Sequence, residues 1–224
     1  ATDEEEEEGE VPPADLSRSE LRAVANTLAE AVVIWQASRG IHSGHQLHTM
    51  ASPKLWDEVF RMHDTDGSGR LSYEEFEDVV RNTLSVQSRI PPEHLKALWD
   101  VVDQNGSGEV SEEEFAQSMY HLQLESWPVM QEARLANIAS VIGSAANKWH
   151  STGSNWYKVF LLIDEDQSGE ISFDELRIFV RRPVPCLNLT SRDLTESELR
   201  GLWRALDGDQ SGKVTTKEFM SFMR

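Results

Sequence analysis

Four stretches of this chain share one pattern: DTDGSGRLSYEE at residues 64–75, DQNGSGEVSEEE at 103–114, DEDQSGEISFDE at 164–175 and DGDQSGKVTTKE at 207–218. Each begins with aspartate, has serine and glycine at its fifth and sixth positions, and ends with glutamate. Oxygen atoms at positions 1, 3, 5, 7, 9 and 12 of such a loop can surround one Ca²⁺ ion, which prefers about six to eight oxygens. The glycine permits the sharp turn that a short loop needs. The pattern therefore predicts four calcium-binding loops.

The predicted ligands follow from the position of each residue in its loop. Position 12 should bind through both carboxylate oxygens, position 9 often acts through water, and position 7 uses its backbone carbonyl. In the order of positions 1, 3, 5, 7, 9 and 12, the predicted ligands are Asp64, Asp66, Ser68, Arg70, Ser72 and Glu75; Asp103, Asn105, Ser107, Glu109, Ser111 and Glu114; Asp164, Asp166, Ser168, Glu170, Ser172 and Glu175; and Asp207, Asp209, Ser211, Lys213, Thr215 and Glu218.

The four loops differ in charge. The first, third and fourth each carry three carboxylates among these side chains, whereas the second carries two because Asn105 replaces an acid. Fewer charges weaken binding, so we expect the second loop to be the weakest site. Loops kept only for structure usually lose the glycine or the closing glutamate, and none has lost either here.

These motifs resemble the EF-hand family, which includes calmodulin and troponin C, and the resemblance covers nearly all of the chain after residue 16. It implies an all-α EF-hand fold in which helices flank each loop. It also implies that loops pair through short β-bridges at position 8, where the chain has Leu71, Val110, Ile171 and Val214. The cofactor implied is Ca²⁺, with up to four ions.

A longer repeat joins the loops into two modules. Apolar residues at helical spacing precede each pair of loops: Leu21, Val24, Ala25, Leu28, Ala31 and Trp35 recur 114 residues later as Leu135, Ile138, Ala139, Ile142, Ala145 and Trp149. We therefore expect an acidic, disordered tail at 1–16 and two modules of a leading helix plus a loop pair at 17–126 and 127–224. This arrangement is similar to multi-EF-hand proteins of dinoflagellates and related protists.

Helix start signals support these boundaries. Ser17-x-x-Glu20 should cap the first leading helix, and Pro128 should open the second. Ser52-Pro53, Pro91-Pro92 and Thr195-x-x-Glu198 lie where helices should enter the first, second and fourth loops. The first module carries an insertion with His42, His45 and His48. These could bind Zn²⁺ or Cu²⁺, but chance clustering is the favoured interpretation.

Composition limits the possible partners. The net charge is −18 over 224 residues, which disfavours nucleic acid and anionic membrane surfaces. No apolar run approaches the ~20 residues of a membrane span. The single cysteine, Cys186, fits a reducing compartment, so we expect a cytoplasmic protein, with the cytoskeleton or a cilium as options. The chain opens on Ala1 rather than Met and could be a piece of a longer protein.

Several roles for calcium stay open at this stage. The first is calcium-responsive binding of a protein partner, such as a basic amphipathic helix. The second is a structural subunit of a larger cytoskeletal or ciliary assembly, in which each leading helix fills the groove of its own pair. Regulation of a larger protein and passive buffering remain alternatives. No phosphate-binding loop, nucleophile elbow or zinc-protease motif is present, so we do not expect an enzyme.

Overall fold

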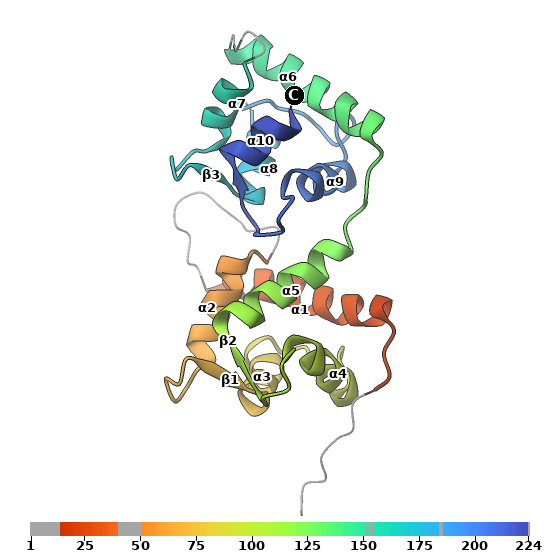
Figure 1. The fold of residues 1–224 in the computed structure, drawn as a ribbon, viewed down its shortest axis with the longest axis vertical. Coiled ribbons are helices and arrows are strands. Elements are labelled where there is room, and N and C mark those ends of the chain that lie inside the picture. Colours follow the sequence, from red (N-terminus) through yellow and green to blue (C-terminus); the bar gives the residue numbers. More distant parts are fainter. Residues whose placement is uncertain (1–13, 40–50, 151, 153–154, 184–185, 224) are drawn as a thin grey trace, which may run out of the picture.

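The protein folds as helices with two short antiparallel strand pairs, arranged in two halves (Figure 1). The computed structural model describes residues 14–39, 51–150, 152, 155–183 and 186–223. The first half contains α1 (Arg18–Ser38), α2 (Pro53–His63), β1 (Arg70–Ser72), α3 (Tyr73–Asp78), the π-helical turn η1 (Val79–Thr83), α4 (Pro92–Val102), β2 (Glu109–Ser111) and α5 (Glu112–Glu125). The second contains α6 (Glu132–His150), α7 (Trp156–Ile163), β3 (Glu170–Ile171), α8 (Phe173–Arg181), α9 (Glu196–Leu206), β4 (Val214–Thr215) and α10 (Thr216–Phe222).

Most helix starts agree with the sequence signals. Ser17 and Glu20 form a capping box at α1, and Thr195 and Glu198 form one at α9. Ser52 caps α2, and both α2 and α4 begin with proline. Because these caps satisfy free backbone amides at the first turn, they set where each helix enters its loop.

The start of the second leading helix was predicted wrongly. Pro128 does not open α6, which begins at Glu132. The intervening chain is held against the second half instead: Trp127 is buried, and the Met130 side chain packs so closely on Gly201 of α9 that an added Cβ there would lie 2.5 Å from it. These contacts keep the chain extended over a stretch that could otherwise have been helical.

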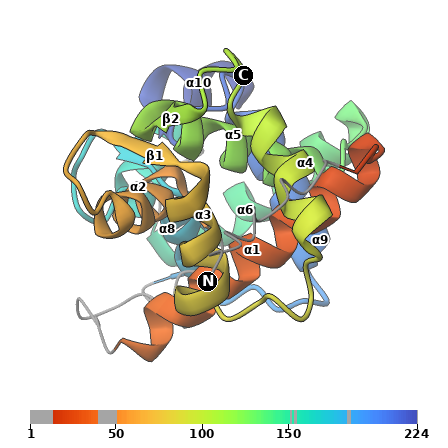
Figure 2. The same ribbon diagram turned by 90° about the horizontal axis from the view of Figure 1, so that it is seen from below.

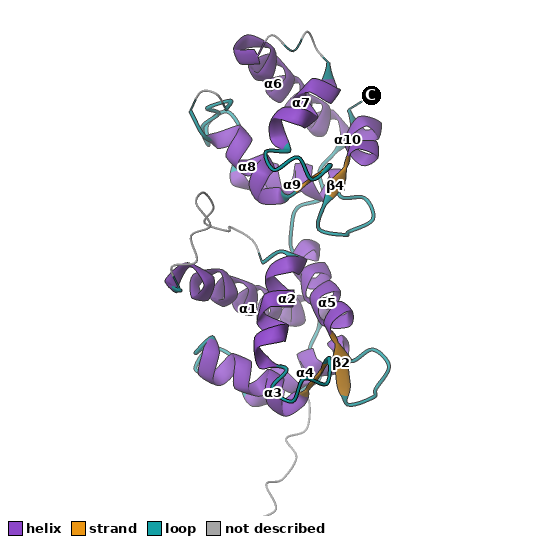
Figure 3. Cartoon of the chain, turned by 90° about the vertical axis from the view of Figure 1, so that its left-hand side faces the viewer, coloured by secondary structure: helices purple, strands orange, loops and turns teal. Residues whose placement is uncertain are grey.

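The strand pairs join the calcium loops as expected. Leu71 lies opposite Val110 in the β1–β2 pair, and Ile171 lies opposite Val214 in the β3–β4 pair. All four side chains are buried. The all-α fold with β-bridges between paired loops is therefore confirmed, and Figure 3 shows the two halves one above the other with their strands on the same side.

Each half has its own hydrophobic core. The first extends from Leu21 to Leu122 and includes the edge-to-face pair of Trp56 and Phe115, whose ring centroids are 5.6 Å apart. The second contains Phe160, Trp203 and Phe219 together with Tyr120 and Leu124, which come from the last turns of α5. One helix, α5, therefore contributes to both cores. The division into modules at residues 126 and 127 remains a proposal.

The two leading helices pack differently. Helix α1 packs against α2, α4 and α5, and Figure 2 shows it beside α4. Helix α6 packs mainly against α7 and α9. Trp35 is partly buried against the first core, whereas the Trp149 side chain lies outside the described part of the structure, as do the tail at 1–13 and the three histidines of the insertion.

Candidate metal centres

The aspartate at position 1 organises each loop. In the first loop, Asp64 accepts the Ser68 amide through Oδ1 at 2.8 Å and the Gly69 amide through Oδ2 at 2.9 Å. The other three loops repeat both bonds. The glycine at position 6 has a positive φ in every loop, for example +72° at Gly69, which only glycine adopts readily. The backbone of each loop therefore closes around its own first carboxylate.

The serine at position 5 connects two further predicted ligand positions. Its amide donates to the side chain of position 3, as from Ser68 to Asp66 at 2.9 Å, and its hydroxyl donates to the carbonyl of position 7. The hydroxyl bond recurs at 2.6 Å in the second loop, 2.9 Å in the third and 3.0 Å in the fourth. Oxygens from positions 1, 3, 5 and 7 thus lie around one point.

Positions 9 and 12 together begin the outgoing helix. In the first loop, Ser72 is the N-cap of α3, and Glu75 Oε2 accepts both the amide and the hydroxyl of Ser72. The other loops form the same capping box at α5, α8 and α10. One oxygen of the glutamate is thus used by the helix and the other faces the loop. We did not predict this second role, although the spacing S/T-x-x-E within each loop signals it.

Three carboxylates converge in three of the loops. Their oxygen atoms lie within 4.8 Å of one another in the sets Asp64, Asp66 and Glu75; Asp164, Asp166 and Glu175; and Asp207, Asp209 and Glu218. The second loop has two carboxylates, and there the Asn105 side-chain amide donates to Glu114 Oε1 at 3.0 Å.

The oxygen set suits a hard divalent cation such as Ca²⁺. In the fourth loop, Glu218 Oε1 is buried without a hydrogen-bond partner, and a metal ion would satisfy it. Asp64, Asp103, Asp164 and Asp207 would contribute through position 1, and the glutamates at position 12 would close the site. The individual ligands remain predictions.

Burial gives carboxylates within the loops different pKa shifts. Hydrogen bonds from Ser68 and Ser211 lower the pKa of Asp66 and Asp209, which lie at the surface. Burial instead raises the pKa of Glu175 and of Asp207, although for Asp207 bonds from Tyr120 and two loop amides oppose the rise. The second pair thus concentrates negative charge in a less hydrated place, where a bound cation is screened less.

The fourth loop has partners from the first half. The Tyr120 hydroxyl of α5 donates to Asp207 Oδ2 at 2.5 Å and accepts from Trp203 Nε1 at 2.9 Å. Pro53 of α2 lies against Gly212, where an added Cβ would be 2.5 Å from the proline ring. In Figure 1 the loop between α9 and β4 comes down onto α5. The sequence carried no signal of these contacts.

A calcium-binding class is also indicated by comparison with known proteins. The family model described as an EF-hand domain pair matches residues 56–120 and 154–224. The chain is 30% identical to the probable calcium-binding protein CML28 of Oryza sativa subsp. japonica, over 75% of this chain and 91% of that protein. It is 20% identical to calcium-binding protein SPEC 2C of Strongylocentrotus purpuratus, over 76% of this chain and 90% of that protein.

The fold and the loops thus define a calcium-binding protein, and the chain belongs to the EF-hand family. It is also 25% identical to calcium-dependent protein kinase 9 of Arabidopsis thaliana, over 74% of this chain but only 24% of that kinase. Within the described residues, none of the helices has the length and apolar character needed to cross a bilayer.

Proposed function

We propose that this chain binds calcium at all four loops and acts as a calcium-responsive interaction protein whose second half carries the response. The observation behind this proposal is the difference between the leading helices. Helix α1 buries residues along its whole length, from Leu21 to Gln36. Among the described side chains of α6, only Ile138, Ile142 and Ala146 are buried. A helix held by fewer contacts is easier to displace when the flanking helices move.

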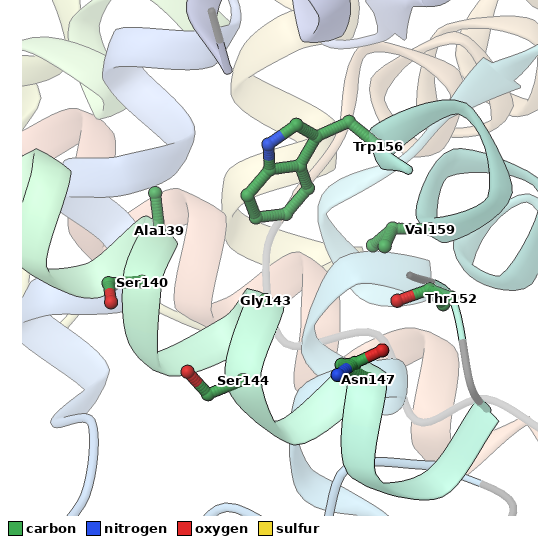
Figure 4. A pocket seen from close by; sticks show the side chains of 8 residues that line it. All are labelled: Ala139, Ser140, Gly143, Ser144, Asn147, Thr152, Trp156 and Val159. Atoms are coloured by element: carbon green, nitrogen blue, oxygen red, sulfur yellow. The ribbon is translucent and has the colours of Figure 1, made fainter. Parts of the chain in front are cut away.

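A cavity lies beside α6. It has a volume of about 230 Å³ and is bounded by Gly143 and Ser144 of α6, by Thr152, and by Trp156 and Val159 of α7 (Figure 4). The outer face of α7 exposes three large apolar side chains, with Tyr157 50%, Leu161 52% and Leu162 37% accessible. Apolar surface of this kind supports binding of a protein partner. With a net charge of −18, the partner we propose is a basic amphipathic helix in the cytoplasm.

Calcium titration with an apolar dye tests this proposal. One variant keeps only the second pair of sites through Glu75→Gln and Glu114→Gln, and its matched counterpart keeps only the first pair through Glu175→Gln and Glu218→Gln. We expect calcium to increase dye binding when the second pair is intact and to change it little when only the first pair is. A response that depends on the first pair alone would contradict the proposal.

A structural role is the second candidate. It is supported by the burial of α1, whose Ala25, Leu28 and Val32 are 0% exposed, because a leading helix packed so fully leaves little groove for another helix. In that case calcium mainly stabilises the fold within a larger cytoskeletal or ciliary assembly, or within a larger regulated protein. We propose no catalytic activity in either case. An unchanged dye signal in both variants would favour the structural role.

A further inference from the structure

We infer that Tyr120 of the first half is a positioning residue of the fourth calcium site, so that calcium binding there depends on contact between the two halves. The inference rests on the proposed four-site function, because it requires the fourth loop to bind calcium. It makes the fourth site a composite of α5 and the loop at 207–218, whereas the other three loops hold their first ligand with their own backbone.

The contact is made by groups that water does not reach. Tyr120, Trp203 and Asp207 are each 0% exposed. The phenol donates to Asp207 Oδ2 at 2.5 Å and receives the indole N–H at 2.9 Å, so its hydroxyl direction is fixed from both sides. A hydrogen bond to a charged group in a buried place is stronger than the same bond in water. Tyr120 therefore restrains the rotation of the Asp207 carboxylate.

The restraint acts on Oδ2, the Asp207 oxygen that Tyr120 shares with a loop amide. Asp207 Oδ2 also accepts the Gly212 amide at 3.1 Å, while Oδ1 accepts the Ser211 amide and lies on the side of Asp209. With Oδ2 held by two donors, Oδ1 stays directed into the loop. A ligand that is already oriented loses less conformational freedom when the ion binds, so the phenol should favour calcium binding.

The third loop provides an internal comparison. Asp164 holds the same position and is also buried, at 4% exposure, and its Oδ2 accepts the Gly169 amide at 3.1 Å. Among the described residues, every hydrogen bond given for Asp64, Asp103 and Asp164 comes from within its own loop. Burial alone therefore does not distinguish the fourth site; the donor from the other half does.

The dependence must be reciprocal. If contact between the halves strengthens calcium binding at the fourth loop, calcium in that loop strengthens the contact by the same factor. Two neighbouring contacts would share in this coupling. Arg204 of α9 donates to the backbone carbonyls of Glu125 and Trp127, at 3.1 Å and 2.5 Å, and Pro53 lies against Gly212. Both join the fourth loop or its incoming helix to the end of α5 or to α2.

The test uses the full chain with one active site at a time. A fourth-site protein carries Glu75→Gln, Glu114→Gln and Glu175→Gln; a third-site protein carries Glu75→Gln, Glu114→Gln and Glu218→Gln. Tyr120→Phe is added to each, and calcium affinity is measured by isothermal titration. We expect about tenfold weaker binding in the fourth-site protein, because a carboxylate released from the phenol must be ordered when the ion binds, and less than twofold in the third-site protein.

Each result has a defined meaning. Equal weakening in both proteins would show a general loss of packing and would overturn the inference, as would an unchanged affinity at the fourth site. If the fourth-site protein with Tyr120 intact binds no calcium, the proposed four-site function fails, which is a different outcome from failure of the inference.

A second measurement leaves Tyr120 in place and does not depend on how Tyr120→Phe folds. The three tyrosines are replaced biosynthetically by 3-fluorotyrosine, and their ¹⁹F resonances are assigned with Tyr73→Phe and Tyr157→Phe. We expect the Tyr120 resonance to shift in step with calcium binding in the fourth-site protein and to shift less in the third-site protein. A resonance that does not move when the fourth site fills would overturn the inference.

Discussion

The two halves repeat one sequence plan but use their leading helices differently. Helix α1 packs on α4 and on α5, which is 14 residues long. Helix α6 packs mainly on α7 and α9. The same apolar spacing therefore produces a fully packed helix in one half and a partly packed helix in the other.

This difference shows that two segments with the same repeated sequence pattern can differ in stability. Both leading helices have the same apolar positions, yet the burial of each position depends on which helices pack against it. In the described residues, the second half has a cavity between α6 and α7. Three predictions test the comparison between the halves.

The largest expected effect is on stability. Leu28→Ala removes a side chain that is 0% exposed in α1 and should lower the free energy of unfolding by about 3 kcal/mol. Ile142→Ala, at a 1% exposed position of α6, should cost about 2 kcal/mol because only three of the described side chains of α6 are buried, so this helix can relax more around the gap. Urea unfolding of both variants in excess calcium measures the difference. A larger loss of unfolding free energy for Ile142→Ala than for Leu28→Ala would contradict the proposed difference between α1 and α6.

The next effect concerns the loops within the first half. We expect the second site to bind calcium about tenfold more weakly than the first, since it carries one carboxylate fewer and the Asn105 amide must release Glu114 Oε1. Single-site proteins made by Glu→Gln changes at position 12 of the other loops, titrated by calorimetry, provide the measurement. The third and fourth sites serve as three-carboxylate references. Tightest binding at the second site would refute this prediction.

The smallest effect concerns the ion pair that fastens α1 to α5. Arg18 binds both carboxylate oxygens of Glu125, at 2.6 Å and 3.0 Å. Arg18→Gln should destabilise the protein by about 0.5 kcal/mol at neutral pH, because both side chains remain partly exposed. Arg134, which pairs with Glu198 of α9, provides the matched variant, Arg134→Gln, in the second half.

The pH dependence of that effect has a definite sign. The hydrogen bond from Arg18 lowers the pKa of Glu125 below its ordinary value. A carboxyl with a lowered pKa in the folded state stabilises the fold above its unfolded pKa, and this contribution is lost as the pH falls through the folded value. The difference between the original protein and Arg18→Gln, measured by urea unfolding, should therefore disappear in acid. A difference that persists there would assign the effect to packing.

Local signals predicted much of the fold. The loop pattern predicted the position of each turn, because the residues of one loop are close in sequence. Ser17, Ser52 and Thr195 marked helix starts for the same reason, since a cap acts within three residues. The pairing of Leu71 with Val110 and of Ile171 with Val214 was expected only from the resemblance to the EF-hand family, since it joins residues far apart in the chain. The start of α6 was misplaced because it depends on Met130 packing against Gly201, a contact between residues far apart in the chain.

The site shows the same limit. Spacing alone predicted the three carboxylates that converge in the first, third and fourth loops and the smaller charge of the second loop, while the complete set of ligands stays a prediction. The Tyr120–Asp207 bond joins residues separated by 87 positions, and no sequence motif singled out Tyr120. The unequal burial of α1 and α6 was hidden as well, because both carry the same apolar spacing and differ in their surroundings.

Because α5 contributes residues to both hydrophobic cores, it affects the order in which the two halves fold during synthesis on the ribosome. A chain is made from its N-terminus, and the first half can fold as soon as it emerges. Tyr120, Leu124 and Trp127 then stay exposed to solvent until the residues of α8 and α9 that bury them have been synthesised. During that interval the exposed apolar rings at the end of α5 are accessible to chaperones. The second half then folds against a first half that is already folded.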